Sequence, residues 1–292
     1  MANYNLTDVA YIKRLMNKYK TTFTKSLGQN FIIDDSICPA MAGYIDDKQS
    51  APYGVIEIGA GIGVLTKELL ERANKVVCIE LDARLFPLLN ETLEGYDNLV
   101  LINEDILKTD LNKIIKEHFD GMDVYVCANL PYYITSPVIM KLLESGSDIK
   151  EIVVMVQKEA GDRLTAKVGS RDSGAVTVAV NYYAKATKLF DVPRTSFMPS
   201  PKVDSCVISL DLSQKTNYDI ADKDLFFRMV KAAFGQRRKT ITNSLSSGMG
   251  LDRQIITKAV NTIGKDISVR AETLNMDELV SLSNTLSEIL KG

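Results

Sequence analysis

The sequence predicts an α/β protein in which a mostly parallel seven-stranded sheet, within residues 1–212, precedes a small all-helical domain at residues 213–292. Short β-rich runs alternate with amphipathic segments as far as about residue 212. The strand signals then stop, and helical periodicity resumes after the polar stretch SQKTNYD. With 292 residues, 46% of them apolar, the chain is long enough to bury a full core.

The predicted strands alternate with helices in the first part of the chain. Amphipathic segments separate the first five strands, which is the pattern of a doubly wound parallel sheet. The last two are joined by residues 191–205, which contain three prolines and are too short for a crossover helix, so we expect that pair to be antiparallel. The strands are predicted at residues 55–58, 76–81, 99–102, 124–127, 152–156, 178–190 and 206–212.

The C-terminal domain is predicted from three helical segments: DLFFRMVKAAF, DRQIITKAVNTI and MDELVSLSNTLSEIL. Residues 213–292 carry 12 Lys and Arg against 9 Asp and Glu, although the whole chain has a net charge of −2. Residues 9–33 and 225–251 each contain five basic residues and no acid. A charge run is most often a solvated face, but two such stretches flanking the sheet domain favour a polyanionic partner.

The composition argues against several kinds of chemistry. The single histidine, His118, stands in no ligand or triad pattern. The sequence therefore offers almost none of the side chains that a zinc site or histidine-based nucleophilic catalysis requires. The four cysteines form no CxxC pair, and three lie within apolar strand-like runs, which predicts buried, reduced thiols. Because no stretch resembles a signal peptide or a membrane span, we expect a cytoplasmic protein.

A glycine-rich loop, EIGAGIG at residues 57–63, follows the first predicted strand. Glycines at alternating positions, among them Gly59 and Gly61, let the backbone turn sharply and let a ligand approach without meeting a Cβ. The GxGxG spacing differs from the GxGxxG that is typical of dinucleotide binders. The loop therefore predicts a ligand site but does not by itself identify the cofactor.

Two carboxylates follow the next two strands. Glu80 stands 21 residues after Gly59, where a carboxylate can accept hydrogen bonds from both hydroxyls of a ribose. Asp105 follows the third strand and could accept from an adenine amino group, the alternative being that it caps the helix LNKIIKEHF. Together with the glycines, they fall at the carboxyl ends of three successive strands, where open α/β sheets bind ligands. This arrangement would serve NAD as well as S-adenosylmethionine.

The motif Asn129-Leu130-Pro131-Tyr132 follows the fourth predicted strand. An aromatic amine such as adenine N6 is a poor nucleophile because its lone pair is delocalised into the ring. The Asn129 oxygen and a backbone carbonyl near Leu130 could accept both amino hydrogens, favouring a more tetrahedral nitrogen whose lone pair points at a sulfonium methyl. Pro131 would fix the backbone and Tyr132 would stack on the target ring. An ordinary strand-to-helix turn is the alternative.

Over nearly its whole length the chain resembles the small-subunit (16S) ribosomal RNA adenine N6,N6-dimethyltransferases. The shared motifs are long: KSLGQNF, EIGAGIG, ANLPYYITSP, FMPSPKVDS and FGQRRKT. The resemblance implies a Rossmann-like, S-adenosylmethionine-dependent methyltransferase domain with a C-terminal RNA-binding domain. It also implies N6,N6-dimethylation of adjacent adenosines near the 3′ end of 16S RNA, during maturation of the small subunit.

By this resemblance, the methionine end of S-adenosylmethionine would be held by Gln29, Asn30 and the backbone of Ile32. The glycine loop would line the cofactor, the second-strand carboxylate would hold its ribose and the third-strand carboxylate its adenine. Phe197 would form the second wall of the base pocket, opposite Tyr132. The predicted cofactor-binding residues are Gln29, Asn30, Ile32, Gly59, Gly61, Glu80, Asp105 and Asn129, and the predicted catalytic residues are Asn129, Leu130, Pro131, Tyr132 and Phe197.

The expected partner is small-subunit ribosomal RNA, within a partly assembled 30S subunit and bound by a monomeric protein. Arg237, Arg238 and Lys239 are the predicted phosphate contacts, because this triplet follows a glycine that can end a helix and so can project cations in different directions. We expect no metal, no membrane contact, and S-adenosylhomocysteine as the cofactor product.

Three other functions remain open at this point. An erythromycin-resistance type methyltransferase of large-subunit rRNA is similar in fold and motifs, but the GQRRK segment and the TSP after NLPYYI argue against it. DNA adenine methyltransferases generally carry Asp/Asn-Pro-Pro-Tyr and a dedicated target-recognition domain. A ribosome-assembly factor that has lost catalysis is disfavoured by the intact Asn129, Tyr132, Glu80 and Asp105.

Overall fold

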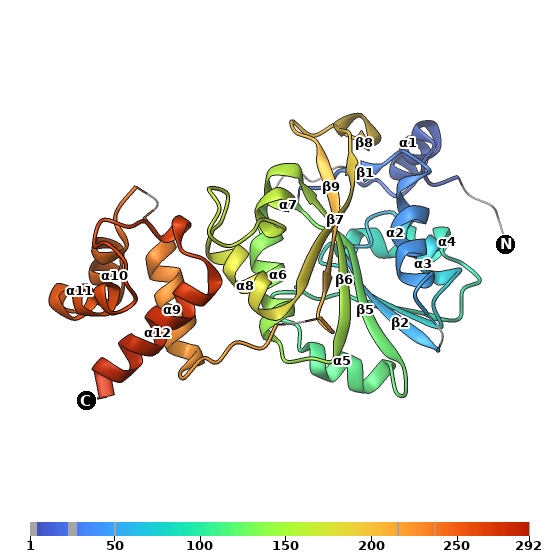
Figure 1. The fold of residues 1–292 in the computed structure, drawn as a ribbon. Helices are drawn as coiled ribbons and strands as arrows, with labels where there is room; N and C mark the ends of the chain where they lie inside the picture. Colours follow the sequence, from blue (N-terminus) through green and yellow to red (C-terminus); the bar gives the residue numbers. More distant parts are fainter. Residues whose placement is uncertain (1–4, 23–27, 50, 215, 237, 292) are drawn as a thin grey trace. The chain divides into compact units, whose positions relative to one another are not determined.

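The computed structural model describes residues 5–22, 28–49, 51–214, 216–236 and 238–291 (Figure 1). The chain forms two compact units. The sheet unit comprises Met1–Gly161 and Thr187–Ser213, and the helical unit comprises Asp162–Ala186 and Gln214–Gly292. The boundary expected after residue 212 therefore misses one segment, since Asp162–Ala186 lies between two strands in the sequence but belongs to the helical unit.

The sheet unit is built on a seven-stranded sheet in the order β4-β3-β2-β5-β6-β9-β7. All pairs from β4 to β6 are parallel, and β9 runs antiparallel to β6, which confirms the predicted mostly parallel sheet. The strands are β2 (Tyr53–Ile58), β3 (Lys75–Ile79), β4 (Leu99–Ile102), β5 (Asp123–Asn129), β6 (Ile149–Gln157), β7 (Lys185–Val192) and β9 (Ser205–Asp211).

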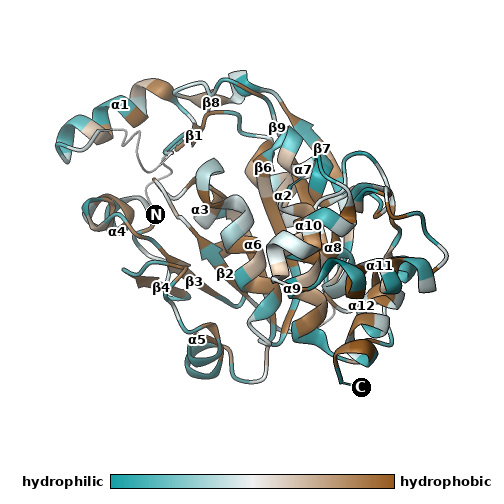
Figure 2. Cartoon of the chain, turned by 90° about the vertical axis from the view of Figure 1, so that its left-hand side faces the viewer, coloured by the Kyte–Doolittle hydropathy of each residue, from teal (hydrophilic) through white to brown (hydrophobic). Residues whose placement is uncertain are grey.

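The order of the strands reverses beside β2. The chain passes from β2 to β3 and β4 on one side, then returns to place β5 and β6 on the other. Ligands of open α/β sheets bind at such a reversal, outside the carboxyl ends of the strands. Every residue of β2 is buried, as expected for a central parallel strand, and β3 and β6 are largely brown in Figure 2.

Helices cover the sheet on both faces (Figure 1). Apolar side chains of α2, α3 and α4 pack with alternate residues of the central strands in one core that includes Val55, Cys78 and Cys127. The helices of this unit are α1 (Val9–Lys18), α2 (Ile37–Asp46), α3 (Val64–Leu70), α4 (Phe86–Thr92), α5 (Leu111–His118), α6 (Thr135–Glu144) and the first part of α7 (Lys158–Leu164).

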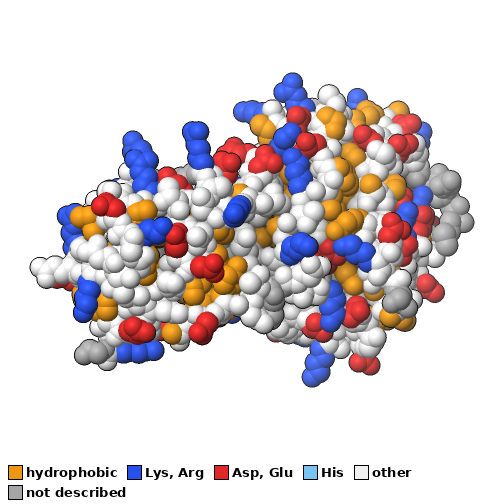
Figure 3. Space-filling model, in the orientation of Figure 1, with side chains coloured by type: hydrophobic (Ala, Val, Ile, Leu, Met, Phe, Trp, Pro, Cys, Tyr) orange, Lys and Arg blue, Asp and Glu red, His pale blue; other side chains and the backbone are white. Residues whose placement is uncertain are grey.

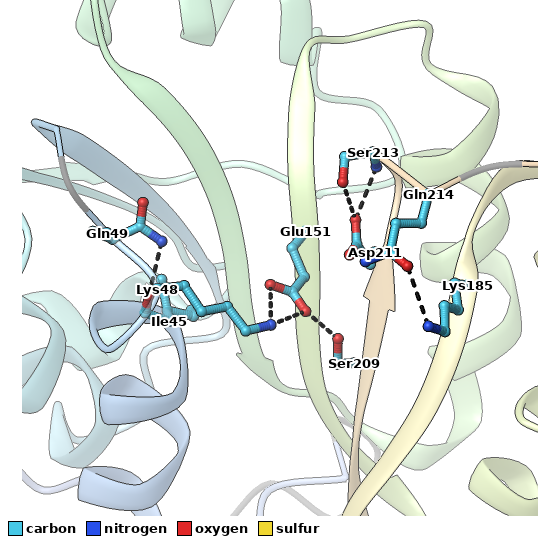
Figure 4. Close-up of polar contacts among 9 residues, drawn as sticks. All are labelled: Ile45, Lys48, Gln49, Glu151, Lys185, Ser209, Asp211, Ser213 and Gln214. Carbon is cyan, nitrogen blue, oxygen red and sulfur yellow. Dashed lines mark hydrogen bonds and ion pairs between the residues drawn. The ribbon is translucent and has the colours of Figure 1, made fainter.

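A buried carboxylate ties the end of α2 to the sheet. Glu151 on β6 accepts hydrogen bonds from Lys48 Nζ at 2.8 and 2.9 Å, and the hydroxyl of Ser209 on β9 donates to the same carboxylate (Figure 4). The Glu151 side chain is almost fully buried, so its charge needs these partners. The contacts therefore hold α2, β6 and β9 together.

A second, two-stranded sheet was not predicted. β1 (Phe31–Ile32) pairs antiparallel with β8 (Phe197–Met198), with Ile32 opposite Phe197. The amide of Ile33 also donates to the carbonyl of Ser196 at 2.9 Å. Strands of two residues carry too little periodicity to be recognised in a sequence, yet this pair joins the N-terminal segment to the chain between β7 and β9.

The helical unit has its own apolar core. It contains α8 (Ala175–Tyr183), α9 (Lys223–Phe234), α10 (Ile241–Met249), α11 (Arg253–Thr262) and α12 (Met276–Lys291). Three of these helices correspond to the three predicted segments, so the all-helical C-terminal region is confirmed. Asp222 and Asp252 cap α9 and α11 by accepting hydrogen bonds from backbone amides.

The strand predicted at residues 178–190 is wrong in its first half. Residues up to Tyr183 form α8, and the strand β7 begins only at Lys185. A mostly apolar run such as AVTVAV has no clear period that distinguishes a buried strand from a buried helix. Tertiary contacts favour the helix here. The ring of Tyr182 packs against Phe226 and Phe227 of α9, with ring centroids 6.3 and 5.2 Å apart.

Candidate active site

One cavity of the sheet unit lies at the carboxyl ends of β2, β3 and β5. All eight residues that the sequence predicted to bind the cofactor line it, as do four of the five predicted catalytic residues, since Asn129 belongs to both sets. The residues in question are Gln29, Asn30, Ile32, Gly59, Gly61, Glu80, Asp105 and Asn129, followed by Leu130, Pro131 and Tyr132. Segments that are just over 100 residues apart in the sequence therefore line the same cavity.

The glycine loop has the backbone that its spacing predicts. Gly59 and Gly61 have φ angles of 79° and 60°, in the left-handed region that side-chain-bearing residues rarely adopt. A Cβ added at Gly59 would meet no atom within 4 Å, so a side chain there would project into open space. The loop fits a ligand that lies directly against the backbone.

Glu80 connects the end of β3 to the glycine loop. Its Oε2 accepts a hydrogen bond from the amide of Gly61 at 3.1 Å, and its Oε1 accepts from the amide of Asp82 at 2.8 Å. The residue is 7% exposed, and burial raises the pKa of its carboxyl group, although the backbone donors oppose the shift. Each oxygen retains a lone pair, so the carboxylate can also accept from ligand hydroxyls.

Asp105 also lines the cavity and follows β4. Its Oδ1 accepts from the amide of Leu107 at 3.0 Å, which orders the turn that follows. The alternative that Asp105 caps the helix LNKIIKEHF is wrong, because Asp110 is the residue that caps α5. Asp105 is therefore left with Oδ2 as an acceptor for a ligand donor.

The N-terminal segment is held against the end of β3 by a residue that sequence reasoning missed. Gln29 Nε2 donates to Asp82 Oδ2 at 3.0 Å, and the same carboxylate pairs with Arg84 at 2.7 Å. Arg84 and Gln29 lower the pKa of Asp82. Asp82 could have been predicted as a site residue from its position, because it stands two residues beyond Glu80 in the loop that follows β3.

Asn129 ends β5 and contacts the same N-terminal segment. Its Nδ2 donates to the carbonyl oxygen of Asn30 at 3.4 Å, while the Asn30 side chain donates to the carbonyl of Gly28 at 3.1 Å. This use of the amide nitrogen leaves Asn129 Oδ1 as an acceptor. Leu130 donates its own amide to the carbonyl of Met155 at 3.1 Å, which anchors the motif on β6.

Phe197 does not reach this cavity. It is 3% exposed, belongs to the core of the sheet unit and stands opposite Ile32 in the β1–β8 pair. Because side chains alternate along a strand, Phe197 and Met198 point to opposite sides of β8, and the Phe197 side chain packs in the core. The structure instead places Tyr133, which is 56% exposed, in the cavity lining. Tyr133 could have been predicted from the sequence, because it directly follows Tyr132 in NLPYY.

The predicted phosphate contacts belong to the helical unit. Arg237 lies outside the described residues. Arg238 and Lys239 are exposed after the end of α9, and neither forms an ion pair with any acid in the described parts of the chain. Figure 3 shows that basic and acidic side chains interleave on the face in view, without one dominant basic patch.

Glu57, at the start of the glycine loop sequence, is buried in the wall of the cavity. Cys78 Sγ donates to its Oε2 at 3.0 Å, and burial raises the pKa of Glu57 to about 7. All four cysteines are buried and free, which confirms that prediction. Within the described residues no cluster of His, Cys, Asp and Glu could hold a metal, and no helix could cross a membrane.

The raised pKa of Glu57 predicts a pH-dependent stability. Between the ordinary pKa of 4.5 and about 7 the folded protein holds a proton that the unfolded chain has released, so the free energy of unfolding falls as pH rises. The Gln side chain of Glu57→Gln cannot ionise. Between pH 5 and pH 8, the free energy of unfolding of this variant should therefore rise by on the order of 2–3 kcal/mol relative to that of wild type. Urea unfolding at both values measures this. A pH-independent difference, like that expected for the exposed Glu94→Gln, would contradict it.

Comparison with known proteins places the chain among rRNA methyltransferases. Residues 20–288 match the family described as ribosomal RNA adenine dimethylase. The chain is 45% identical, over 94% of both sequences, to ribosomal RNA small subunit methyltransferase A of Bacillus cytotoxicus. Among solved structures it resembles a dimethyladenosine transferase from Plasmodium falciparum (26% identity, 89% and 98% coverage, TM-score 0.68) and the 23S rRNA methyltransferase ErmE (25% identity, 88% and 100% coverage, TM-score 0.64).

Proposed function

Because the chain belongs to the ribosomal RNA adenine dimethylase family, we propose that its cavity brings S-adenosylmethionine and a target adenine of 16S rRNA together for N6,N6-dimethylation. The observation that carries this proposal is the single cavity lined by the glycine loop, Glu80, Asp105 and the Asn129–Tyr132 motif. The substrate is a pair of adjacent adenosines near the 3′ end of 16S RNA.

The cofactor side of the cavity offers one acceptor to each polar part of the ligand. Glu80 would accept from the ribose hydroxyls, and Asp105 Oδ2 would accept from the adenine amino group. The backbone of the glycine loop would lie directly against the cofactor, and the segment from Gln29 to Ile32 would hold the methionine end of the cofactor. Once bound, S-adenosylmethionine supplies a methyl group on a sulfonium, and the described residues offer no metal cluster beside it.

Asn129 would act on the reacting amine. Its Oδ1 and the Leu130 carbonyl oxygen would each accept one N6 hydrogen, which makes the nitrogen more tetrahedral and directs its lone pair at the methyl group. The contact from Asn129 Nδ2 to the carbonyl of Asn30 supports this role, because it keeps the oxygen from rotating away. Tyr132 would stack on the extruded base.

The small-subunit substrate is favoured over the large-subunit alternative by sequence. The identity to the small-subunit enzymes is 45%, whereas it is 25% to ErmE, although both share the fold. A catalytically silent assembly factor is disfavoured by the acceptors that line the cavity. We further expect a monomer that acts in the cytoplasm on a partly assembled 30S subunit during small-subunit maturation.

Mass spectrometry of nucleosides tests the proposal. The protein is incubated with S-adenosylmethionine and either 16S RNA, 30S particles stripped of late proteins, or 23S RNA. N6,N6-dimethyladenosine should be found in the small-subunit samples, and fragment mapping should place it near the 3′ end. Modification of 23S RNA alone would favour the large-subunit function, and no methylation with normal cofactor binding would favour an assembly factor.

The exposed cations after α9 should set RNA affinity without affecting the chemistry. Replacing Arg238 and Lys239 with Ala should weaken rRNA binding and make its salt dependence shallower by up to roughly 1.5–2 units of slope, at about 0.7–0.9 per phosphate contact. Filter binding across a salt series measures this. The matched control is Arg253→Ala with Lys258→Ala, which removes two exposed cations from α11. Equal slopes in the two double variants would refute a specific role for Arg238 and Lys239.

A further inference from the structure

A single hydrogen bond anchors the far end of the Tyr132 ring. The Tyr132 hydroxyl lies 2.8 Å from Ser205 Oγ, although the two residues are 73 positions apart. Tyr132 opens the short 3-10 helix that follows the Asn129–Pro131 turn, and Ser205 opens β9. A residue on a turn is thus attached to a residue of the sheet.

Ser205 is a rigid anchor point. It is 0% exposed and is paired with Gln157 of β6 across the antiparallel ladder. The preceding residue, Asp204, accepts from the amides of Arg194 at 2.9 Å and Lys158 at 3.0 Å, so the entry to β9 is fixed from two sides. The hydroxyl of Ser205 therefore has little freedom to follow the Tyr132 ring.

The orientation of the Tyr132 ring matters because stacking depends on the plane of both rings. The ring lines the cavity and is only partly buried. Without its hydroxyl contact, it could turn about two side-chain torsions. Burial raises the pKa of Tyr132, so its hydroxyl remains protonated at neutral pH and can take part in the bond as donor or acceptor.

We propose that Ser205 is a positioning residue for the target adenine, because its hydroxyl holds the Tyr132 ring in the plane on which the extruded base stacks. This inference rests on the proposed function and adds a residue to it. Ser205 itself does not line the cavity, so it acts through Tyr132. Such support for a contacting residue is how active sites keep their geometry.

A double-mutant cycle tests the proposal, using Ser205→Ala, Tyr132→Phe and the double variant. Each single change should raise KM for the RNA substrate about 3- to 10-fold, the effect of one hydrogen bond, with kcat and cofactor affinity nearly unchanged. The double variant should be no worse than either single one. Ser209→Ala, a buried serine of the same strand that contacts Glu151 instead, should leave KM unchanged.

The outcomes separate the possible roles of Ser205. A purely structural role would make the Ser205→Ala effect equally large in the Tyr132→Phe background, and this additivity would overturn the proposal. Wild-type KM in folded Ser205→Ala protein would also overturn it. If Ser205→Ala fails to fold, Tyr132→Phe still removes the bond, and an unchanged KM there would refute the proposal. Wild-type protein that leaves 16S RNA unmethylated would overturn the proposed function as well.

Discussion

Asn129→Ala should slow methyl transfer by on the order of 100-fold or more, because it removes an acceptor that acts on the amine during the reaction. The affinity for S-adenosylmethionine should stay close to that of wild type. Asn129 lines the cavity and ends β5, and it is joined to the N-terminal segment by a long hydrogen bond of 3.4 Å to the carbonyl of Asn30. Single-turnover kinetics at saturating RNA isolate the chemical step.

The matched control for this change is Asn112→Ala. Asn112 is exposed on α5 and its amide donates to the carbonyl of Ser145 at 3.4 Å, a contact of the same kind and length. The control should transfer methyl groups at the wild-type rate. If Asn129→Ala did so too, the proposed role of the NLPY motif in orienting the amine would be wrong.

Glu80→Ala should weaken binding of S-adenosylmethionine by roughly 1.5–3 kcal/mol, since two ligand hydroxyls lose a charged acceptor. The structure gives a second reason: the same carboxylate holds the amide of Gly61, so its removal also loosens the glycine loop. Calorimetric titration measures the change. Glu80→Gln keeps a carbonyl acceptor and should lose less affinity than the alanine variant.

An exposed glutamate provides the reference for Glu80. Glu94→Ala removes the same side chain from a surface position on the same unit and should leave the dissociation constant unchanged. An unchanged dissociation constant in folded Glu80→Ala protein would show that the ribose is held elsewhere. A loss equal in the alanine and glutamine variants would instead point to the negative charge as the essential feature.

The sequence by itself predicted the features that depend on local pattern. Strands with continuous apolar runs were placed within a few residues, as β2 and β5 show, because a buried parallel strand needs apolar side chains on both faces. The cavity-lining residues were found because ligand-binding side chains of open sheets follow the strands. Gly59, Glu80 and Asn129 each stand just after or at the end of a strand whose apolar run marks the position.

Only the tertiary structure decided which residues face which partner. The run around Val178 became a helix because its apolar side chains pack on α9, and short apolar runs do not encode that choice. Phe197 went to the core because β8 pairs with β1, a contact across 165 positions. The hydrogen bond between Ser205 and Tyr132 likewise joins segments 73 positions apart in the sequence. Local propensity sets where strands and turns occur, whereas contacts between distant segments set the direction of each side chain.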